Sequence, residues 1–353
     1  MSSRVLVTGG AGFVGSNLAD RLAADGHQVV VLDALARPGV ERNLEWLQRR
    51  HGELIEPVIG DVRDAELVQR AMHGAEACFH FAAQVAVTTS MVDPAGDLAI
   101  NINGTFNVLE ASRSQAAPVP VIFASTNKVY GDLQEFGSKL GRAGYEPANS
   151  ALARHGVGEA QPLDFHTPYG CSKGAADQYV LDYARSFGVP TCVLRMSCIY
   201  GERQMGTEDQ GWVAHFLIRA LEGKPITLYG DGHQVRDVLY VGNAVEAYLA
   251  AWGAIDQVHG RAFNLGGGPT NAISLRTLLD HISGLLGSKV DVEVSDWRPG
   301  DQRWFVADTR AIDAELRLPA KLDWRLGIER LLRWLAHERD LPFAAPVPVR
   351  AAL

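Results

Sequence analysis

The chain has 353 residues, of which 47% are hydrophobic and 21% charged, and its net charge at pH 7 is -8. This length and apolar content suit one large α/β unit with a smaller lobe. The negative charge argues against nucleic acid as a partner, and no apolar run approaches the ~20 residues of a membrane span. Because residues 1–3 leave no room for a signal peptide before the first strand, we expect a cytoplasmic protein.

The cysteines and histidines show no pattern typical of a metal site. Cysteine occurs at positions 78, 171, 192 and 198, and the eleven histidines are scattered without a paired helical motif. Apolar neighbours around most of the cysteines favour core positions over disulfides. We therefore expect neither a metal nor a disulfide.

A strand, a glycine-rich turn and a helix are the first predicted elements. The apolar residues 5–7 precede Thr8, and an amphipathic stretch follows the turn as far as Gly26. Glycines in such a turn let the backbone approach a pyrophosphate at the N-terminus of the helix, where free N–H groups favour negative charge. The cofactor contacts expected from this turn are Gly9, Gly12, Phe13, Val14 and Gly15.

The second predicted strand, residues 28–32, is followed by Asp33. A carboxylate at this place suits a bidentate hold on an adenosine ribose, and it would repel a 2′-phosphate. The sequence therefore favours NAD over NADP. Arg37 is the one nearby residue that favours the opposite choice, unless it faces solvent or touches the adenine.

Later strand ends supply further expected cofactor contacts. Asp61 and Val62 follow the third apolar strand, where they can meet the amine and the ring of an adenine. Small residues at the end of the fourth strand allow phosphates and ribose to pass closely. Asn101 lies in the segment that opens the next helix and can equally be a structural polar link. From this region we expect contacts from Phe81, Ala82, Ala83, Gln84 and Asn101.

Downstream, a hydroxyl, a phenol and an ammonium form the set that nicotinamide redox chemistry on an alcohol requires. Thr126 ends a buried apolar strand, and Tyr169 and Lys173 are four positions apart, so they face one side of a helix. A phenol titrates near ~10, so its use as a base near pH 7 needs about 4 kcal/mol of stabilisation of the phenolate. A nearby ammonium and an oxidised nicotinamide can supply it. We expect Ser125, Tyr169 and Lys173 to touch the cofactor as well.

Strands and helices alternate from residue 4 to about residue 195, which predicts a Rossmann-type doubly wound parallel sheet. We expect residues 1–195 to form an NAD-binding domain to which the chain returns at 238–263. Residues 196–237 and 264–340 are expected to form a smaller C-terminal lobe that binds the substrate, and residues 341–353 a tail.

The segment 131–164 separates Thr126 from Tyr169 and is rich in Gly, Ser, Ala and charge. Loops of this length in compact domains are often functional or disordered. Because its ends are tied to the site, we interpret the segment as a partly mobile cover. A passive surface insertion is the alternative.

These motifs resemble the extended short-chain dehydrogenase/reductase superfamily, and within it the NAD-dependent epimerase/dehydratase family, over roughly residues 4–335. The motifs at 125–131, 167–179 and 209–213 are similar to those of CDP-sugar 2-epimerases. The resemblance implies an isomerase with tightly bound NAD that inverts C2 of a CDP-hexose by transient oxidation to a keto-sugar. It implies conversion of CDP-paratose to CDP-tyvelose, with CDP-glucose to CDP-mannose as a further conversion of the same kind.

The residues after Thr126 indicate the reaction type. In sugar-nucleotide 4,6-dehydratases an Asp-Glu pair follows this threonine, whereas Asn127 and Lys128 stand here, which disfavours elimination of water. A C4 ketone does not acidify the proton on C2, so direct oxidation at C2 is favoured over enolisation, with a retro-aldol opening of the C2–C3 bond as the alternative. A nucleotide-sugar 4-epimerase and a non-catalytic NAD-binding regulator remain as alternative functions.

Substrate contacts are expected mainly from the second lobe. Arg236 and Arg303 match positions at which sugar-nucleotide enzymes hold the pyrophosphate, although either can instead pair with Asp237 or Asp301. Thr88 offers a hydroxyl to the sugar unless it only caps a helix. The full set of expected substrate contacts is Gln84, Thr88, Thr126, Asn127, Ser197, Gln210, Tyr229, Arg236 and Arg303.

Two apolar helical stretches, 98–109 and 175–187, favour pairing of two subunits. Related enzymes join such helices into a four-helix bundle, although an intrachain core gives the same pattern. We expect a homodimer or homotetramer.

Overall fold

The computed structural model describes residues 2–298 and 301–341. Apart from Leu341, the tail expected at 341–353 lies outside the described residues. Within the described ranges, no helix has both the length and the apolar character needed to cross a membrane.

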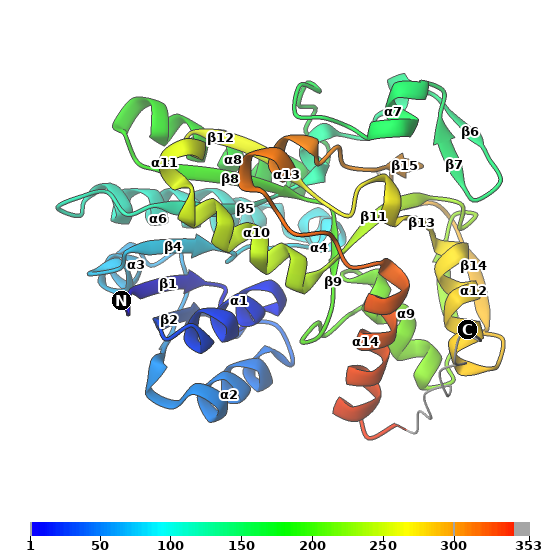
Figure 1. Cartoon of the computed structure of the whole chain (residues 1–353), viewed down its shortest axis with the longest axis horizontal. Helices are drawn as coiled ribbons and strands as arrows, with labels where there is room; N and C mark the ends of the chain where they lie inside the picture. The colour runs from blue at the N-terminus through cyan, green and yellow to red at the C-terminus, as the bar shows by residue number, and fades with distance from the viewer. Residues whose placement is uncertain (1, 299–300, 342–353) are drawn as a thin grey trace, which may run out of the picture.

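The centre of the molecule is a seven-stranded parallel sheet in the order β12-β8-β5-β4-β1-β2-β3 (Figure 1). Apolar residues of its central strands are buried, as expected of strands covered on both faces. The predicted doubly wound α/β fold is confirmed. The strands are β1 (Arg4–Thr8), β2 (Gln28–Asp33), β3 (Ile55–Ile59), β4 (Ala77–His80), β5 (Val121–Thr126), β8 (Thr191–Met196) and β12 (Arg261–Leu265).

Helices cover both faces of this sheet (Figure 1). One face carries α1 (Phe13–Ala24), α2 (Val40–His51), α10 (Val241–Gly253), α11 (Ile255–Val258) and α13 (Arg310–Leu316). The other carries α3 (Ala65–Met72), α6 (Gly104–Arg113) and the long α8 (Thr167–Phe187). Since all seven strands are parallel, their carboxyl ends meet at one edge, which is where open α/β sheets bind ligands.

Short helical segments lie at the junctions of these elements. Of these, α4 and η3 matter most for the site, because α4 packs against α8 and η3 directly follows β5. The segments are η1 (Gly52–Leu54), α4 (Val87–Val92), α5 (Pro94–Leu98), η2 (Ala99–Asn103), η3 (Asn127–Tyr130) and η5 (Pro269–Asn271).

A smaller lobe, built from residues that follow β8, has a separate apolar core. It contains a two-stranded sheet of β10 (Ile226–Tyr229) and β14 (Val292–Ser295). A second sheet joins β13 (Ala272–Ser274), β11 (Val235–Tyr240) and β15 (Trp304–Phe305), and β9 (Cys198–Tyr200) pairs with β11. The helices of this lobe are α9 (Trp212–Leu221), α12 (Leu275–Leu286) and α14 (Trp324–Glu338).

The segment 131–164 is more regular than the loop that the sequence led us to expect. It contains η4 (Gln134–Phe136), a hairpin of β6 (Ser138–Leu140) and β7 (Tyr145–Pro147), and α7 (Ser150–His155). Backbone hydrogen bonds fasten it to the second lobe, from Tyr145 N to His233 O at 2.9 Å and from Val157 N to Val306 O at 2.7 Å. These contacts explain its regular structure, and its mobility stays a prediction.

Candidate active site

The turn between β1 and α1 is a backbone cradle that only glycine allows. Gly9 has a φ of 69°, and a Cβ on it would lie 2.6 Å from the backbone nitrogen of Ala82. A Cβ on Gly15 would collide with the carbonyl oxygen of Gly9. The turn therefore leaves its N–H groups and the N-terminus of α1 close to whatever lies above them, an arrangement suited to a pyrophosphate.

A cleft of about 340 Å³ opens above this turn along the carboxyl edge of the sheet. It brings together fifteen of the residues expected from the sequence, drawn from many separate segments of the chain. They are Gly9, Gly12, Phe13, Val14, Gly15, Asp33, Asp61, Val62, Phe81, Ala82, Ala83, Ser125, Tyr169, Lys173 and Gln210.

Asp33 stands at the ribose end of the cleft. Its carboxylate accepts hydrogen bonds from Ala11 N at 3.0 Å and Leu35 N at 2.9 Å. Burial raises the pKa of Asp33, and these backbone bonds oppose the shift. Arg37 lines the same cleft, and burial lowers its pKa. Asp33, which favours NAD, and Arg37, which favours NADP, thus line the same cleft.

Asp61, at the adenine end of the predicted site, is paired with Arg63. The guanidinium lies 2.7 Å from the carboxylate and lowers the pKa of Asp61. Both carboxylate oxygens already accept hydrogen bonds from Arg63, so contact with an adenine amine stays a prediction.

Gln84 and Asn101 are occupied by the protein itself. The side chain of Gln84 bonds to both the N–H and the carbonyl of Ala86. Asn101 is buried, accepts from Gln84 N at 2.8 Å and donates to Ser172 Oγ at 2.9 Å. These contacts support the structural alternative for Asn101, because they join the loop after β4 to α8.

Tyr169 and Lys173 lie one turn apart on α8, and Thr126 ends the adjacent strand β5. Burial raises the pKa of Tyr169 to about 12, and a hydrogen bond with Thr126 opposes that rise. Burial lowers the pKa of Lys173 to about 7, while Asp177 and Asp97 oppose that fall. The ammonium nitrogen lies 4.1 Å from the centre of the Phe123 ring.

These shifts bear on the expected electrostatics. We expected the charge of Lys173 and that of an oxidised nicotinamide together to hold the phenolate of Tyr169. Both side chains are at least nine-tenths buried, and desolvation alone favours the neutral phenol and lowers the pKa of the amine. A positive charge beside the phenol would favour the phenolate.

A buried ion pair beneath the site was not expected from the sequence. Arg195 on β8 binds both carboxylate oxygens of Asp177 on α8, each at 3.0 Å. Asp177 also accepts from Ser125 Oγ at 2.7 Å, and Arg195 donates to Tyr130 OH at 3.0 Å. The pair fixes α8 against β5 and β8. Its only sequence signal is an arginine inside an apolar strand.

The turn after Thr126 faces the second lobe. Asn127 donates to the side-chain oxygen of Gln302 at 3.3 Å. Burial and the nearby Arg236 lower the pKa of Lys128, and Asp301 opposes this. Arg236 is itself buried and bound to the carboxylate of Asp301 at 2.6 Å, which is the pairing that the sequence left open as its alternative.

The remaining expected sugar contacts differ in their surroundings. The hydroxyl of Ser197 is hydrogen-bonded to Asp237, so it is already used within the protein. The hydroxyl oxygen of Thr88 is buried without a hydrogen-bond partner in the described structure. Thr88 does not line the cofactor cleft, so its role as a sugar contact stays a prediction.

Tyr229 contacts two charged side chains, Arg298 and Glu208. The guanidinium carbon of Arg298 lies 3.9 Å from the centre of its ring, and Glu208 accepts from its hydroxyl. We had not selected Arg298 from the sequence, although it opens the same Arg-Pro-Gly-Asp-Gln-Arg stretch that ends in Arg303.

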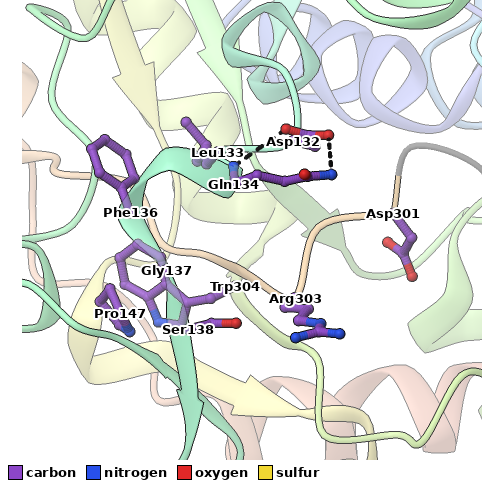
Figure 2. Close-up of a pocket in the computed structure, with 10 residues that line it drawn as sticks. All are labelled: Asp132, Leu133, Gln134, Phe136, Gly137, Ser138, Pro147, Asp301, Arg303 and Trp304. Carbon is purple, nitrogen blue, oxygen red and sulfur yellow. Dashed lines mark hydrogen bonds between the residues drawn. The ribbon is translucent and has the colours of Figure 1, made fainter.

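Arg303 lies instead at a second cavity of about 360 Å³. Figure 2 shows it with Asp132, Asp301 and Trp304 around the cavity, beside residues of the segment 131–164. Its guanidinium carbon lies 5.2 Å from the Tyr145 ring centre. Neither Arg236 nor Arg303 lines the cofactor cleft, and Asp301, the partner of Arg236, lines the same cavity as Arg303.

Further residues line the cleft that we had not expected from the sequence, several of them from the start of the second lobe. For Asn43, the sequence feature that could have indicated a role is an asparagine within a polar helix. No local sequence feature pointed to the other residues. They are Leu32, Ala34, Ala36, Pro38, Val40, Asn43, Gly60, Val85, Ile100, Ala124, Met196, Arg203, Gln204, Met205 and Thr207.

The cleft fits a dinucleotide. It combines a glycine cradle at a helix N-terminus, the Asp33 carboxylate and two buried side-chain oxygens, of Asn43 and Gln204, that have no hydrogen-bond partner in the described structure. The phosphates of a dinucleotide can bind the glycine cradle, and its hydroxyl and amine groups can donate hydrogen bonds to the carboxylate and the side-chain oxygens. Among the described residues, no cluster of His, Cys, Asp and Glu is arranged to hold a metal ion.

The chain matches a known protein family and is similar to curated proteins. Residues 5–266 match the NAD dependent epimerase/dehydratase family. The chain is 40% identical to CDP-paratose 2-epimerase of Salmonella typhi over 94% of this chain and 98% of that protein. It is 34% identical to UDP-glucose 4-epimerase of Mycolicibacterium smegmatis over 85% of this chain and 88% of that protein.

Solved structures agree with this picture. UDP-glucose 4-epimerase of Thermus thermophilus in complex with NAD is similar with a TM-score of 0.78 and 32% identity, over 94% of this chain and 98% of that chain. UDP-glucose 4-epimerase of Thermotoga maritima with UDP-glucose gives a TM-score of 0.80 and 28% identity, over 95% and 99% of the two chains.

Proposed function

The chain belongs to the NAD dependent epimerase/dehydratase family, and from this premise we propose that it inverts C2 of a CDP-linked hexose. The observation that carries the proposal is the η3 turn after Thr126, where Asn127 and Lys128 provide an amide and an amine. Elimination of water needs a carboxylic acid and a base at this place, so a redox-neutral epimerisation fits better. The 40% identity to a CDP-paratose 2-epimerase supports the same reaction.

The cofactor is NAD, which the glycine turn and Asp33 would hold. When bound, its oxidised nicotinamide accepts a hydride from the sugar, returns it later and adds positive charge to the site. That positive charge favours the phenolate of Tyr169 over its neutral phenol.

Tyr169 is the proposed acid and base. It takes the proton of the sugar hydroxyl as the carbon is oxidised and gives it back when the ketone is reduced. The hydrogen bond between Thr126 and Tyr169 places the two oxygens together, so Thr126 can align the same hydroxyl. Lys173, in its charged form, stabilises the phenolate of the preceding turn of α8.

Oxidation at C2 itself is the route that we favour. A ketone at C4 acidifies the protons on C3 and C5, so it gives no simple path to inversion at C2. A ketone at C2 inverts the centre when the hydride returns to its opposite face, and this requires the sugar to turn within the site. Retro-aldol opening of the C2–C3 bond from a C4 ketone is the competing route.

Charged groups of the second lobe support a nucleotide-linked substrate. Arg236 lies near enough to Lys128 to lower its pKa, and Asp301 balances part of their charge. We propose that a pyrophosphate competes with Asp301 for Arg236. Tyr229 and Arg298 would then meet the nucleobase by stacking.

A nucleotide-sugar 4-epimerase is the second candidate. It is favoured by the 34% identity to a UDP-glucose 4-epimerase and by the fold shared with two such enzymes. The two candidates use the same Thr126, Tyr169 and Lys173. They differ in the sugar carbon that faces the nicotinamide, which is C2 in the first and C4 in the second.

Proton NMR of the product separates these candidates. The purified protein is incubated, without added reductant, with CDP-paratose, CDP-tyvelose, CDP-glucose and UDP-glucose. Inversion confined to C2 of a CDP-sugar supports the proposal, and the preferred sugar sets the substrate. Inversion at C4, or reaction with UDP-glucose alone, replaces it by the second candidate.

Deuterium at C2 of the sugar separates the two chemical routes. Direct oxidation breaks the C2–H bond and predicts a primary isotope effect on C2 inversion. A retro-aldol route leaves that bond intact and predicts none.

We also propose a homodimer or homotetramer. Large apolar side chains are about half exposed on α5, α6 and α8, namely Leu98, Phe106, Tyr179 and Phe187. Two such helix faces from two subunits would cover each other. Light scattering tests this, since a single species of monomer mass would reject it.

A further inference from the structure

Residues 202–210, here called the strap, run from the second lobe along the outer side of the cofactor cleft. Five of them line the cleft, namely Arg203, Gln204, Met205, Thr207 and Gln210. In Figure 1 the chain that leaves β9 descends between α2 and α14. The strap therefore lies between the two lobes and lines one side of the cleft in which we expect the dinucleotide.

The backbone of the strap is fastened to the first domain. Asn17 on α1 donates to the carbonyl of Glu202 at 3.0 Å, and Asn43 on α2 donates to the carbonyl of Arg203 at 3.2 Å. Met205 packs so closely on Gly39 that a Cβ there would lie 3.1 Å from its Cγ. These contacts join the strap to the same two helices that border the predicted pyrophosphate and adenosine sites.

Arg203 is the central anchor of the strap. Its guanidinium carbon lies 4.0 Å from the Trp46 ring and 5.4 Å from the Trp334 ring. Trp46 belongs to α2 in the first domain and Trp334 to α14 in the second lobe. Glu338, also on α14, lies 4.0 Å from the guanidinium. A cation held by two indoles from different lobes ties those lobes together across the strap.

The backbone of Arg203 is held in an unusual conformation. Its φ is 70°, a left-handed value that costs energy for a residue other than glycine. The stack with Trp46 and Trp334 supplies a reason for a large side chain at this position, since glycine would fit the backbone without strain.

A redox-neutral epimerase has a particular need for such a structure. The hydride taken from the sugar has to return to the same molecule, so a cofactor that leaves in its reduced form abandons a keto-sugar and an inactive enzyme. We propose that Arg203 is a positioning residue that keeps the strap closed on NAD between turnovers. This inference concerns the cofactor alone and does not depend on which sugar carbon is inverted.

The test measures release of NAD from purified enzyme by coupling free NAD to a separate NAD-dependent dehydrogenase. Arg203→Ala removes the central cation of the stack and Trp334→Leu removes one of its two rings, and Trp334 itself lies outside the cleft lining. Arg325→Ala is the matched control, because Arg325 lies 4.4 Å from the Trp324 ring on the same helix, away from the cleft. We expect both test variants to release NAD at least about 10-fold faster than wild type, and the control to match wild type.

Two further readouts separate retention from simple loss of stability. With saturating NAD, kcat of Trp334→Leu should return to within about 2-fold of wild type, because Trp334 lies outside the cleft lining. Arg203→Lys keeps the charge without the planar face, so it should restore retention only in part. Wild-type release rates in both test variants would overturn the proposal. So would an equal loss of melting temperature with and without NAD, which marks the stack as purely structural.

Discussion

Tyr169 and Lys173 lie one helical turn apart on α8, and burial moves their pKa values in opposite directions, to about 12 and about 7. Both shifts favour the uncharged forms, because burial removes the phenolate and the ammonium from water. A positive charge close to the phenol, such as that of an oxidised nicotinamide, would favour the phenolate.

Replacement of the phenol tests the proposed acid and base. Tyr169→Phe removes only the hydroxyl, and we expect kcat to fall by about 10²–10⁴-fold while NAD remains bound. Tyr179→Phe on the exposed part of the same helix is the control and should keep full activity. Turnover of Tyr169→Phe at the wild-type rate would contradict the assignment.

Lys173 predicts a pH dependence of stability in protein stripped of NAD. Its pKa is about 7 when folded against an ordinary 10.5, so between these values the unfolded chain binds more protons. The free energy of unfolding should therefore rise from pH 7 to pH 10, by at most about 1.4 kcal/mol per pH unit from this group. Below pH 7 the lysine is charged in both states and adds no slope.

The comparison with Lys173→Met isolates this effect, since methionine keeps the length of the chain without its charge. Urea unfolding at each pH should show that the variant lacks the extra rise. Parallel curves for the two proteins would show that Lys173 keeps its ordinary pKa.

Asp33 should decide between NAD and NADP. Asp33→Asn keeps one of the two oxygens that accept from Ala11 N and Leu35 N, and it removes the charge that repels a 2′-phosphate. We expect the ratio of NADP to NAD affinity to rise at least about 10-fold, with Arg37 in the same cleft to meet the phosphate. Calorimetric titration of both dinucleotides measures the ratio. Asp256→Asn, on the exposed side of α11, should leave it unchanged.

The buried pair of Asp177 and Arg195 should contribute strongly to stability. Asp177→Asn leaves the guanidinium, which is 5% exposed, without its counter-charge, at a cost of about 3–5 kcal/mol in the free energy of unfolding. Glu66→Gln removes an exposed partner of Arg70 and should change stability by less than about 1 kcal/mol. Equal denaturant midpoints for the two variants would refute this account.

The covalent order of residues already determined much of this protein. Alternating apolar strands and helices predicted the doubly wound sheet, because each strand must be buried on both faces. The glycine turn, Asp33 and the four-residue spacing of Tyr169 and Lys173 act through local geometry, so the chain alone was enough to recognise them. Asn127 and Lys128 indicated the reaction class for the same reason.

Tertiary structure decided what depends on residues far apart in the chain. Arg203 gains its role only because Trp46 and Trp334, from separate lobes, meet around it. Arg236 and Arg303 are far apart in sequence, yet Asp301, which pairs with the buried Arg236, lines the same cavity as Arg303. The pKa values of Tyr169 and Lys173 follow from burial, which no local pattern reports. Desolvation and long-range packing are properties of the assembled fold, and they set the charge state of this site.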